Sequence, residues 1–269
     1  SLATQGRLGA AMEFDGIDDY VDISGLAATV DETQGTMAVW VYVASDDLDL
    51  ATHGIFEVGD ASSGNDYLGF RQTTSDTIRF RYTSGGTLNG VNVEAQGDTW
   101  VHYTATWDAP NINLYENGVL TEGPTAHAGV IGSTLLDQAV IGADASAGIG
   151  NYFKGKIDDV RIYNRVLSAD QIKRLAELGM TTRIGVTPPE NPNTAGDLVG
   201  HWSFDGKETT IISAGDKTGS NNGTISGHAT YGTPGLGTDT YTTAGTGSWT
   251  APDGVTQVTM HCWGAGGAG

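Results

Sequence analysis

Residues 100–118 read WVHYTATWDAPNINLYENG, and this stretch decides the class of the fold. Apolar and polar side chains alternate along WVHYTATW and again along INLYE, which is the period-two pattern of a strand with one buried face. Asn117-Gly118 then stands between INLYE and VLTE. Asn-Gly between two alternating runs is the strongest short-range signal for a hairpin. The stretch therefore predicts antiparallel strands joined by tight turns.

The same alternation dominates the first 165 positions of the chain. Glycine or Asn-Gly separates the alternating runs about every eight to twelve residues, a spacing typical of sandwiches and jelly rolls. We predict an all-β fold, a two-sheet antiparallel jelly-roll sandwich. Its clearest strands are Thr36–Ala44, Thr77–Thr83, Trp100–Trp107, Asn111–Glu116, Ala139–Ile141 and Ile157–Tyr163.

One short helix is expected near residue 170. Ser168 is a good N-cap, and Gln171 three residues later completes a capping box. Leu167 and Ile172 flank the cap as in a hydrophobic staple. Gly179 stands where a helix C-terminus favours glycine. The pattern predicts a helix docked against a sheet.

The charge of the chain excludes several classes of partner. Thirty-two acidic and 13 basic residues among 269 leave a net charge of −19. Nucleic acids and anionic membrane surfaces both require basic patches, so neither is an expected partner. Cys262 is the single cysteine, which excludes an intrachain disulfide and a thiolate metal site. Without an 18-residue apolar run no transmembrane helix is expected, and without a signal peptide at Ser1 we expect a processed product or an excised fragment.

Several motifs in order resemble one known family. They are GAAMEFDGIDDYVDI (9–23), TMAVWVYV (36–43), the hairpin region at 100–118 and GKIDDVRIYNRVLSADQI (155–172). Residues 9–179 resemble a laminin G-like, concanavalin A-type jelly-roll domain of the bacterial surface kind. The resemblance implies a non-catalytic extracellular module with a structural or adhesive role in a surface appendage, filament or fibre. Its expected location is a cell or virion surface, and a carbohydrate-binding, lectin-like module is the alternative.

The order of the segments differs from that of the family. Such a domain usually opens with a strand resembling LVGHWSFD, followed by a polar stretch and a loop, but here these occupy 198–237. We divide the chain into a body (1–179), a proline-rich linker (180–197), a completing segment (198–237) and a glycine-rich β segment (238–269). The last of these resembles glycine-rich modules of phage tail fibres and bacterial surface proteins.

Three interpretations of the completing segment remain open. It closes its own domain in cis, inserts into another copy of the chain in trans, or begins a truncated second repeat. In the family the first and last strands are neighbours, so Leu198–Asp205 is expected to pair with Ile157–Tyr163. Trp202 and Phe204 lie on one apolar face of that strand and need a core to enter. In trans, these two residues would mediate strand exchange, with the protein itself as partner.

Five aspartates form the candidate metal site. Asp15, Asp18 and Asp19 are clustered near the start of the body, and Asp158 and Asp159 lie near its end. Calcium takes six to eight oxygen ligands, which two acidic turns on neighbouring strands could supply. Related domains often carry a structural Ca²⁺, so the resemblance also implies one. The alternative is that these aspartates accept hydrogen bonds from loop amides.

Neither a hydrolytic nor a glycan site is strongly marked. Glu13-Phe-Asp15 invites comparison with the E-x-D-x-E pattern of glucanases of the same fold, but Ile17 stands where the second glutamate is required. We therefore expect no enzymatic activity. If the protein binds surface glycans, Tyr67 and Tyr152 are the loop aromatics that we expect to contact them.

Overall fold

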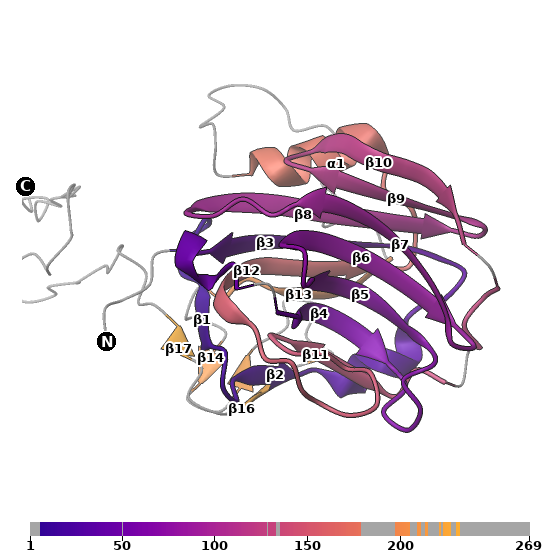
Figure 1. The fold of residues 1–269 in the computed structure, drawn as a ribbon. Coiled ribbons are helices and arrows are strands. Elements are labelled where there is room, and N and C mark those ends of the chain that lie inside the picture. Colours follow the sequence, from indigo (N-terminus) through magenta and orange to yellow (C-terminus); the bar gives the residue numbers. More distant parts are fainter. Residues whose placement is uncertain are drawn as a thin grey trace, which may run out of the picture.

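The computed structural model describes residues 6–49, 51–127, 129–132, 135–178, 197–204, 209–210, 213–214, 221, 223–226 and 230–231. Two antiparallel sheets face each other and enclose the core, as Figure 1 shows. The predicted jelly-roll sandwich is confirmed. All six strands expected from the alternation are present, with bounds that shift by at most three residues.

The first sheet has eight strands in the order β10-β9-β8-β3-β12-β1-β17, with β13 also paired to β12. In chain order these are β1 (Met12–Asp15), β3 (Gln34–Val43), β8 (Thr99–Asp108), β9 (Asn111–Glu116), β10 (Val119–Ala126), β12 (Lys154–Tyr163), β13 (Leu198–Trp202) and β17 (Thr230–Tyr231). The β9–β10 turn is the predicted hairpin: Asn117 and Gly118 have φ values of 50° and 81°. Such a turn requires positive φ at both central positions.

The second sheet has nine strands in the order β14-β15-β16-β2-β11-β4-β5-β6-β7. They are β2 (Tyr20–Asp22), β4 (His53–Gly59), β5 (Tyr67–Gln72), β6 (Thr77–Ser84), β7 (Thr87–Glu94), β11 (Gln138–Ile141), β14 (Thr209–Thr210), β15 (Ser213–Ala214) and β16 (Gly223–Ser226). Two short 3₁₀ helices, η1 (Ser24–Thr29) and η2 (Ser45–Asp47), precede β3 and β4.

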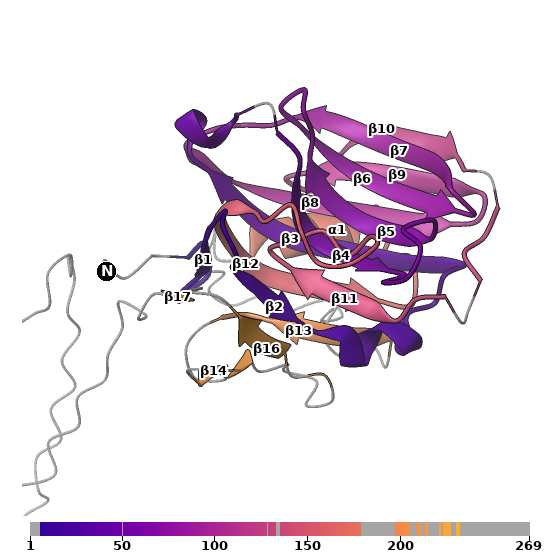
Figure 2. The ribbon, with the colours of Figure 1, turned by 60° about the horizontal axis from the view of Figure 1, so that its bottom comes forward.

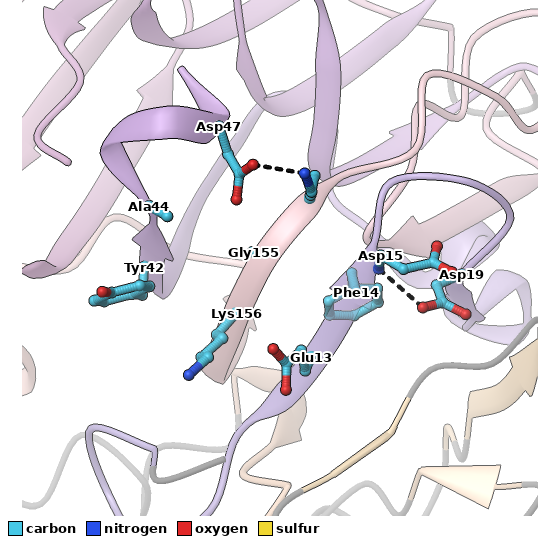
Figure 3. A pocket seen from close by; sticks show the side chains of 10 residues that line it. Glu13, Phe14, Asp15, Asp19, Tyr42, Ala44, Asp47, Gly155 and Lys156 are labelled. Carbon is cyan, nitrogen blue, oxygen red and sulfur yellow. Dashed lines mark hydrogen bonds and ion pairs between the residues drawn. The ribbon is translucent and has the colours of Figure 1, made fainter. Parts of the chain in front are cut away.

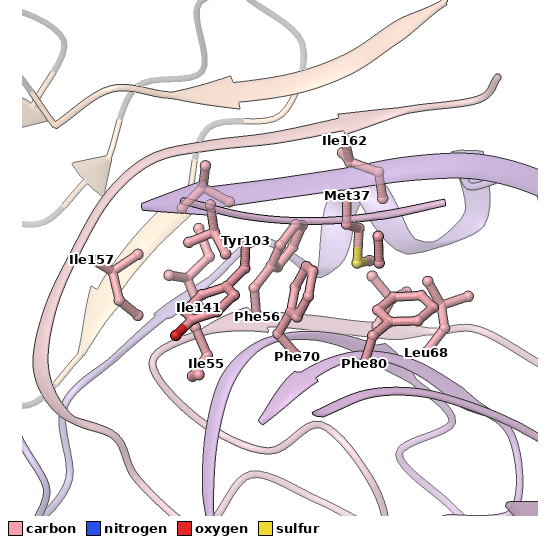
Figure 4. Close-up of a cluster of buried hydrophobic side chains, with 14 of the residues drawn as sticks. Met37, Ile55, Phe56, Leu68, Phe70, Phe80, Tyr103, Ile141, Ile157 and Ile162 are labelled. Carbon is pink, nitrogen blue, oxygen red and sulfur yellow. The ribbon is translucent and has the colours of Figure 1, made fainter. Parts of the chain in front are cut away.

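The core fills the space between the sheets with side chains from the inward face of each strand. Met37, Tyr103 and Ile162 from the first sheet meet aromatic and aliphatic side chains from the second, among them Phe56 and Phe80, as Figure 4 shows. The alternate side chains of the same strands lie on the two outer faces, since successive side chains of a strand point to opposite faces. Functional side chains have to be sought there.

The predicted helix is α1 (Ala169–Glu177), and it covers part of the outer face of the eight-stranded sheet. Both hydrogen bonds of the capping box are present: Gln171 N donates to Ser168 Oγ, and Ser168 N donates to Gln171 Oε1. Ile172 and Leu175 pack with Leu167 and with Ala38 of β3. Gly179, the expected end of the helix, lies outside the described residues.

Strand β13 lies in the sheet of its own chain. It pairs antiparallel with β12, with Trp202 opposite Val160 and Gly200 opposite Ile162. Trp202 and Phe204 are 0% and 1% exposed and belong to the central core. Strand β16 pairs with β2 and β17 with β1, so this segment extends the edges of both sheets, as Figure 2 shows along the side next to β2. The proposed domain boundaries themselves, and the glycine-rich segment beyond 237, stay predictions, since 238–269 lie outside the described residues.

Candidate functional site

An acidic turn follows β1 and brings three of the predicted aspartates together. The turn is held by two backbone donors: Asp15 N donates to Asp19 Oδ2 at 3.0 Å, and Ile17 N donates to Asp15 Oδ1 at 2.8 Å. Asp15, Asp18 and Asp19 each offer a carboxylate oxygen within 4.8 Å of the others. Asp15 and Asp18 are exposed, whereas Asp19 is buried. Both alternatives for these aspartates are therefore compatible with the turn. The carboxylates accept hydrogen bonds from loop amides, and they also form a compact cluster of oxygen atoms that could hold a metal ion.

Asp158 and Asp159 do not belong to this cluster. Asp15 lies opposite Lys154 in the sheet, so Asp158 is four residues, or about 13 Å, further along β12. Asp158 Oδ2 accepts a hydrogen bond from Leu8 N. A β-bulge follows, with Asp159 at a φ of 48°. Contrary to the expectation from the sequence, this register therefore does not bring Asp158 and Asp159 to an ion held by the three aspartates of the acidic turn.

Asp159 has partners of its own in the interior. Its carboxylate accepts hydrogen bonds from Arg161 at 2.8 and 3.0 Å and pairs with His201 Nε2 of β13 at 2.5 Å. Burial alone would raise the pKa of Asp159, but Arg161 and His201 outweigh it and hold that pKa well below its usual range. The carboxylate thus fastens β13 to β12 through side chains as well as through the backbone ladder.

A pocket of about 490 Å³ opens beside the acidic turn, on the outer face of the eight-stranded sheet (Figure 3). Its floor is β12, with β1 on one side and β3 on the other. Val41 and Val43 point into the core, so Tyr42 between them points outward. The lining residues are Glu13, Phe14, Asp15, Asp19, Tyr42, Ala44, Asp47, Lys154, Gly155 and Lys156.

Two rows of side chains across neighbouring strands shape this pocket. In the first row Glu13, Lys156, Tyr42 and Trp100 are successive cross-strand partners from β1 to β8. The rings of Tyr42 and Trp100 lie 5.7 Å apart at 55°, and Lys156 Nζ lies 5.4 Å from the centre of the Tyr42 ring. Both aromatic side chains are half-buried. The row therefore offers aromatic surface next to charged groups.

The second row closes the pocket towards the acidic turn. Asp15 of β1 lies opposite Lys154 of β12, and Lys154 Nζ forms an ion pair with Asp47 Oδ1 at 2.7 Å. Asp47 belongs to η2, so this ion pair joins the loop after β3 to the start of β12. The arrangement combines aromatic surface, hydrogen-bonding carboxylates and ammonium groups, which is the kind of lining that orients a polar ligand.

The two aromatics predicted from loops lie elsewhere. Tyr67 is the first residue of β5, and the guanidinium of Arg81 lies 3.8 Å from the centre of its ring. Tyr152 packs against Tyr20 with ring centres 6.2 Å apart. Both are half-buried, and neither lines the pocket of Figure 3. A role in ligand binding for either residue stays a prediction.

Neither Tyr42 nor Trp100 was singled out from the sequence as a candidate ligand contact. Three other tryptophans are buried: Trp107 and Trp202 lie in the central core, and Trp40 lies on the outer face beneath the Arg7 guanidinium. The signal for the fourth was present, since Trp100 stands at the start of its strand and out of phase with Val101 and Tyr103 in the core. The sequence does not show which of the outward-facing side chains are covered by other helices, strands or loops.

A buried ionic cluster on the opposite sheet has a structural explanation. Arg81 donates to Glu57 at 2.6 and 3.0 Å and to Asp144 at 2.7 Å, and Arg71 also donates to Asp144. Ala145 N donates to Glu57 Oε2 at 3.0 Å. Burial raises the pKa of Glu57 to about 7, while Arg81 opposes that shift. The cluster fastens the loop after β11 across the outer face of β4 to β6.

The comparisons with known proteins agree on the fold. Residues 15–173 match the model of the concanavalin A-like lectin/glucanases superfamily, called Laminin_G_3. No curated protein matches the chain in sequence. Among the described residues, no helix has the length and apolar character needed to cross a bilayer.

Three solved structures illustrate the likeness. A Bacteroides ovatus protein proposed to bind carbohydrate is 19% identical with a TM-score of 0.60; the match covers 84% of this chain and 60% of that protein. The CBM40 module of the Ruminococcus gnavus IT-sialidase, bound to α2,3-sialyllactose, is 19% identical with a TM-score of 0.51 over 61% of this chain and 96% of the module. A mutant NanB sialidase from Streptococcus pneumoniae is 17% identical with a TM-score of 0.51 over 61% of this chain and 27% of the enzyme. At these identities the likeness concerns the fold.

Proposed function

Since the chain belongs to the concanavalin A-like lectin/glucanases superfamily, we propose that it is a carbohydrate-binding, lectin-like module with its ligand site in the pocket of Figure 3. One observation carries the placement of the site: half-buried Tyr42, which packs against Trp100, lines the pocket together with carboxylates and ammonium groups. Sugar rings present apolar C–H faces and polar hydroxyl edges, which match aromatic surface and hydrogen-bonding groups respectively.

The structural neighbours support the class of ligand without identifying it. One is proposed to bind carbohydrate, and another is a module bound to a sialylated sugar. This chain spans 60% of the length of the first and nearly all of the second. The proposal therefore concerns glycan binding in general, and the location of the site is argued from the residues of this pocket alone.

Binding to a glycan array followed by calorimetry tests the proposal. We expect a saturable ligand whose affinity falls at least about tenfold in Tyr42→Ala, equivalent to about 1.4 kcal/mol of binding free energy. Tyr152→Ala is the matched control, because it removes a half-buried aromatic that lies outside the pocket. Circular dichroism establishes that both variants fold. Equal affinity of Tyr42→Ala and the unaltered chain would place the site elsewhere, and the absence of any glycan ligand would contradict the function.

We also propose that the acidic turn holds a structural Ca²⁺. Asp15, Asp18 and Asp19 supply hard oxygen ligands within reach of a single ion, and Ca²⁺ completes its shell with backbone carbonyls and water. An ion that binds the folded state alone stabilises it by about 2.7 kcal/mol at a concentration one hundred times its dissociation constant. The melting temperature should rise with added Ca²⁺ and fall in chelator, and Asp18→Asn should abolish the difference while Glu94→Gln on β7 keeps it. A melting temperature that changes neither with added Ca²⁺ nor with chelator would refute the proposed Ca²⁺ site.

We further propose that the module is not catalytic, although Glu13 lines the pocket. Glucanases of the same fold need a second glutamate in the E-x-D-x-E pattern, and Ile17 occupies that position here. Prolonged incubation with β-glucans should release no reducing ends above the level of a Glu13→Gln variant. Turnover that this variant loses would reverse the assignment.

A further inference from the structure

We infer that the pocket of Figure 3 selects sugars by charge: it favours an amino-bearing sugar, accepts a neutral one and rejects an acidic one. The inference rests on the carbohydrate-binding function proposed above and adds the class of ligand. It depends on the balance of charged groups around the pocket, on how the two lysines are engaged, and on the aromatic pair at one end.

Carboxylates outnumber ammonium groups at this pocket. The lining carries Glu13, Asp15, Asp19 and Asp47, and Asp18 lies within 4.8 Å of the acidic turn's other carboxylates. The opposing charges come from two lysines at positions 154 and 156. Five negative and two positive groups leave an excess of three negative charges. A Ca²⁺ ion at the turn would reduce this excess to one and would not reverse its sign.

Neither lysine is well placed to attract an acidic ligand. The Lys154 ammonium is already paired with Asp47 at 2.7 Å. Lys156 is the direct cross-strand neighbour of Glu13, so a carboxylate lies on the next strand, and its ammonium group also lies over the Tyr42 ring. Opposite charges in directly facing positions of a sheet stabilise each other. An incoming carboxylate would have to compete with these partners.

A cationic ligand meets the opposite situation. An ammonium group in the pocket would gain attraction from the excess carboxylates, and aromatic faces attract cations as well. Trp100 supplies such a face at the end of the first row, next to the Tyr42 ring that already contacts the Lys156 ammonium. Discrimination then arises mainly from repulsion of the wrong ligand, which is a common source of specificity at polar sites. The net charge of −19 acts in the same direction at longer range.

Calorimetry on the full chain with three 1,4-linked trisaccharides tests the inference. They are the β-linked trimer of glucosamine (amino), the β-linked trimer of N-acetylglucosamine (neutral) and the α-linked trimer of galacturonate (acidic). We expect the amino sugar to bind most tightly and the acidic sugar at least about tenfold more weakly than the neutral one. The advantage of the amino sugar should shrink as salt is raised, because salt screens charges at the surface. Measurements with Ca²⁺ and with chelator should keep the order, with a smaller spread when Ca²⁺ is present.

Glu13→Gln gives the residue-level test, and Glu94→Gln is its control with the same change in net charge on the other sheet. The ratio of amino-sugar to neutral-sugar affinity should fall severalfold in Glu13→Gln and stay constant in Glu94→Gln. Acidic binding equal to or tighter than neutral binding would overturn the charge selection and leave the glycan-binding function intact. Equal ratios in both variants would also overturn it. If neither these sugars nor any glycan on an array bind, the proposed function itself fails and this inference fails with it.

Discussion

Replacing Trp202 with alanine tests whether β13 completes the core of its own domain. Trp202 is fully buried, faces Val160 across the β12–β13 ladder and donates from Nε1 to the carbonyl of Asn221 at 3.2 Å. A buried tryptophan removes about 200 Å² from water, worth about 5 kcal/mol at 25 cal/mol per Å². Large-to-small changes of this kind cost about 3–5 kcal/mol in practice. We expect a loss in that range, a large share of the stability of an ordinary domain.

Urea unfolding followed by far-ultraviolet circular dichroism measures this loss. Val119→Ala is the control, because Val119 is 65% exposed and its loss should change the free energy of unfolding by less than about 0.5 kcal/mol. Trp202→Phe keeps an aromatic ring but removes the hydrogen bond from Trp202 Nε1 to the Asn221 carbonyl, so an intermediate loss is expected. The free energy of unfolding should therefore increase from Trp202→Ala to Trp202→Phe to the unaltered chain, and this order tests the buried contact.

The result that refutes the reasoning is equally specific. A loss below about 1 kcal/mol in Trp202→Ala would mean that the segment carrying Trp202 and Phe204 is a dispensable addition to a body that folds without it. Repeating the measurement at two protein concentrations separates the two modes of closure. A segment in its own chain gives unfolding curves independent of concentration, whereas one exchanged between copies gives curves that shift to higher urea as concentration rises.

Three further predictions concern assembly and buried charge. Sedimentation velocity should show a monomer at all concentrations, because β13 lies in its own chain's sheet; species that lengthen with concentration would instead show exchange between copies. Burial lowers the pKa of His102 to about 3, below the unfolded value of 6.5, so its contribution to stability is complete above pH 6.5 and is lost as the pH falls towards 3. Between pH 7 and pH 5 the free energy of unfolding should therefore fall about 2 kcal/mol more in the unaltered chain than in His102→Gln. Arg81→Gln should cost about 3 kcal/mol or more in urea unfolding at pH 7, since it leaves the buried Glu57 without its cation; a loss under 1 kcal/mol would show that the loop after β11 does not depend on that pair.

Much of the fold could be predicted because its signals are local. Alternation along TMAVWVYV and WVHYTATW identifies strands wherever those strands pair, and Asn117-Gly118 defines a turn by the backbone that these two residues tolerate. The helix was equally readable, because Ser168 and Gln171 cap it through hydrogen bonds only three residues apart. Each of these signals lies within a dozen residues, so no knowledge of the partner strand is needed.

The candidate site was also predicted correctly where its residues are close in sequence and incorrectly where they are distant. Asp15, Asp18 and Asp19 were grouped correctly because one turn holds all three. Asp158 and Asp159 were grouped with them because terminal strands were expected to be neighbours, and β1 and β12 do pair. The register, however, places Lys154 beside Asp15, and the bulge at Asp159 directs that carboxylate to Arg161.

Local sequence patterns were enough to locate six strands of the body, the turn at Asn117-Gly118 and an apolar strand at 198–205 that needs a core. The pairing of this strand with β12 of its own chain depends on the tertiary structure, as does the presence of Tyr42, rather than Tyr67 or Tyr152, in the lining of the pocket. Period-two alternation assigns each side chain to one of two faces but does not say which outward face another element covers. That depends on contacts between residues far apart in the chain: α1 lies over Ala38 while Tyr42, four residues along the same strand, stays half-buried at the pocket.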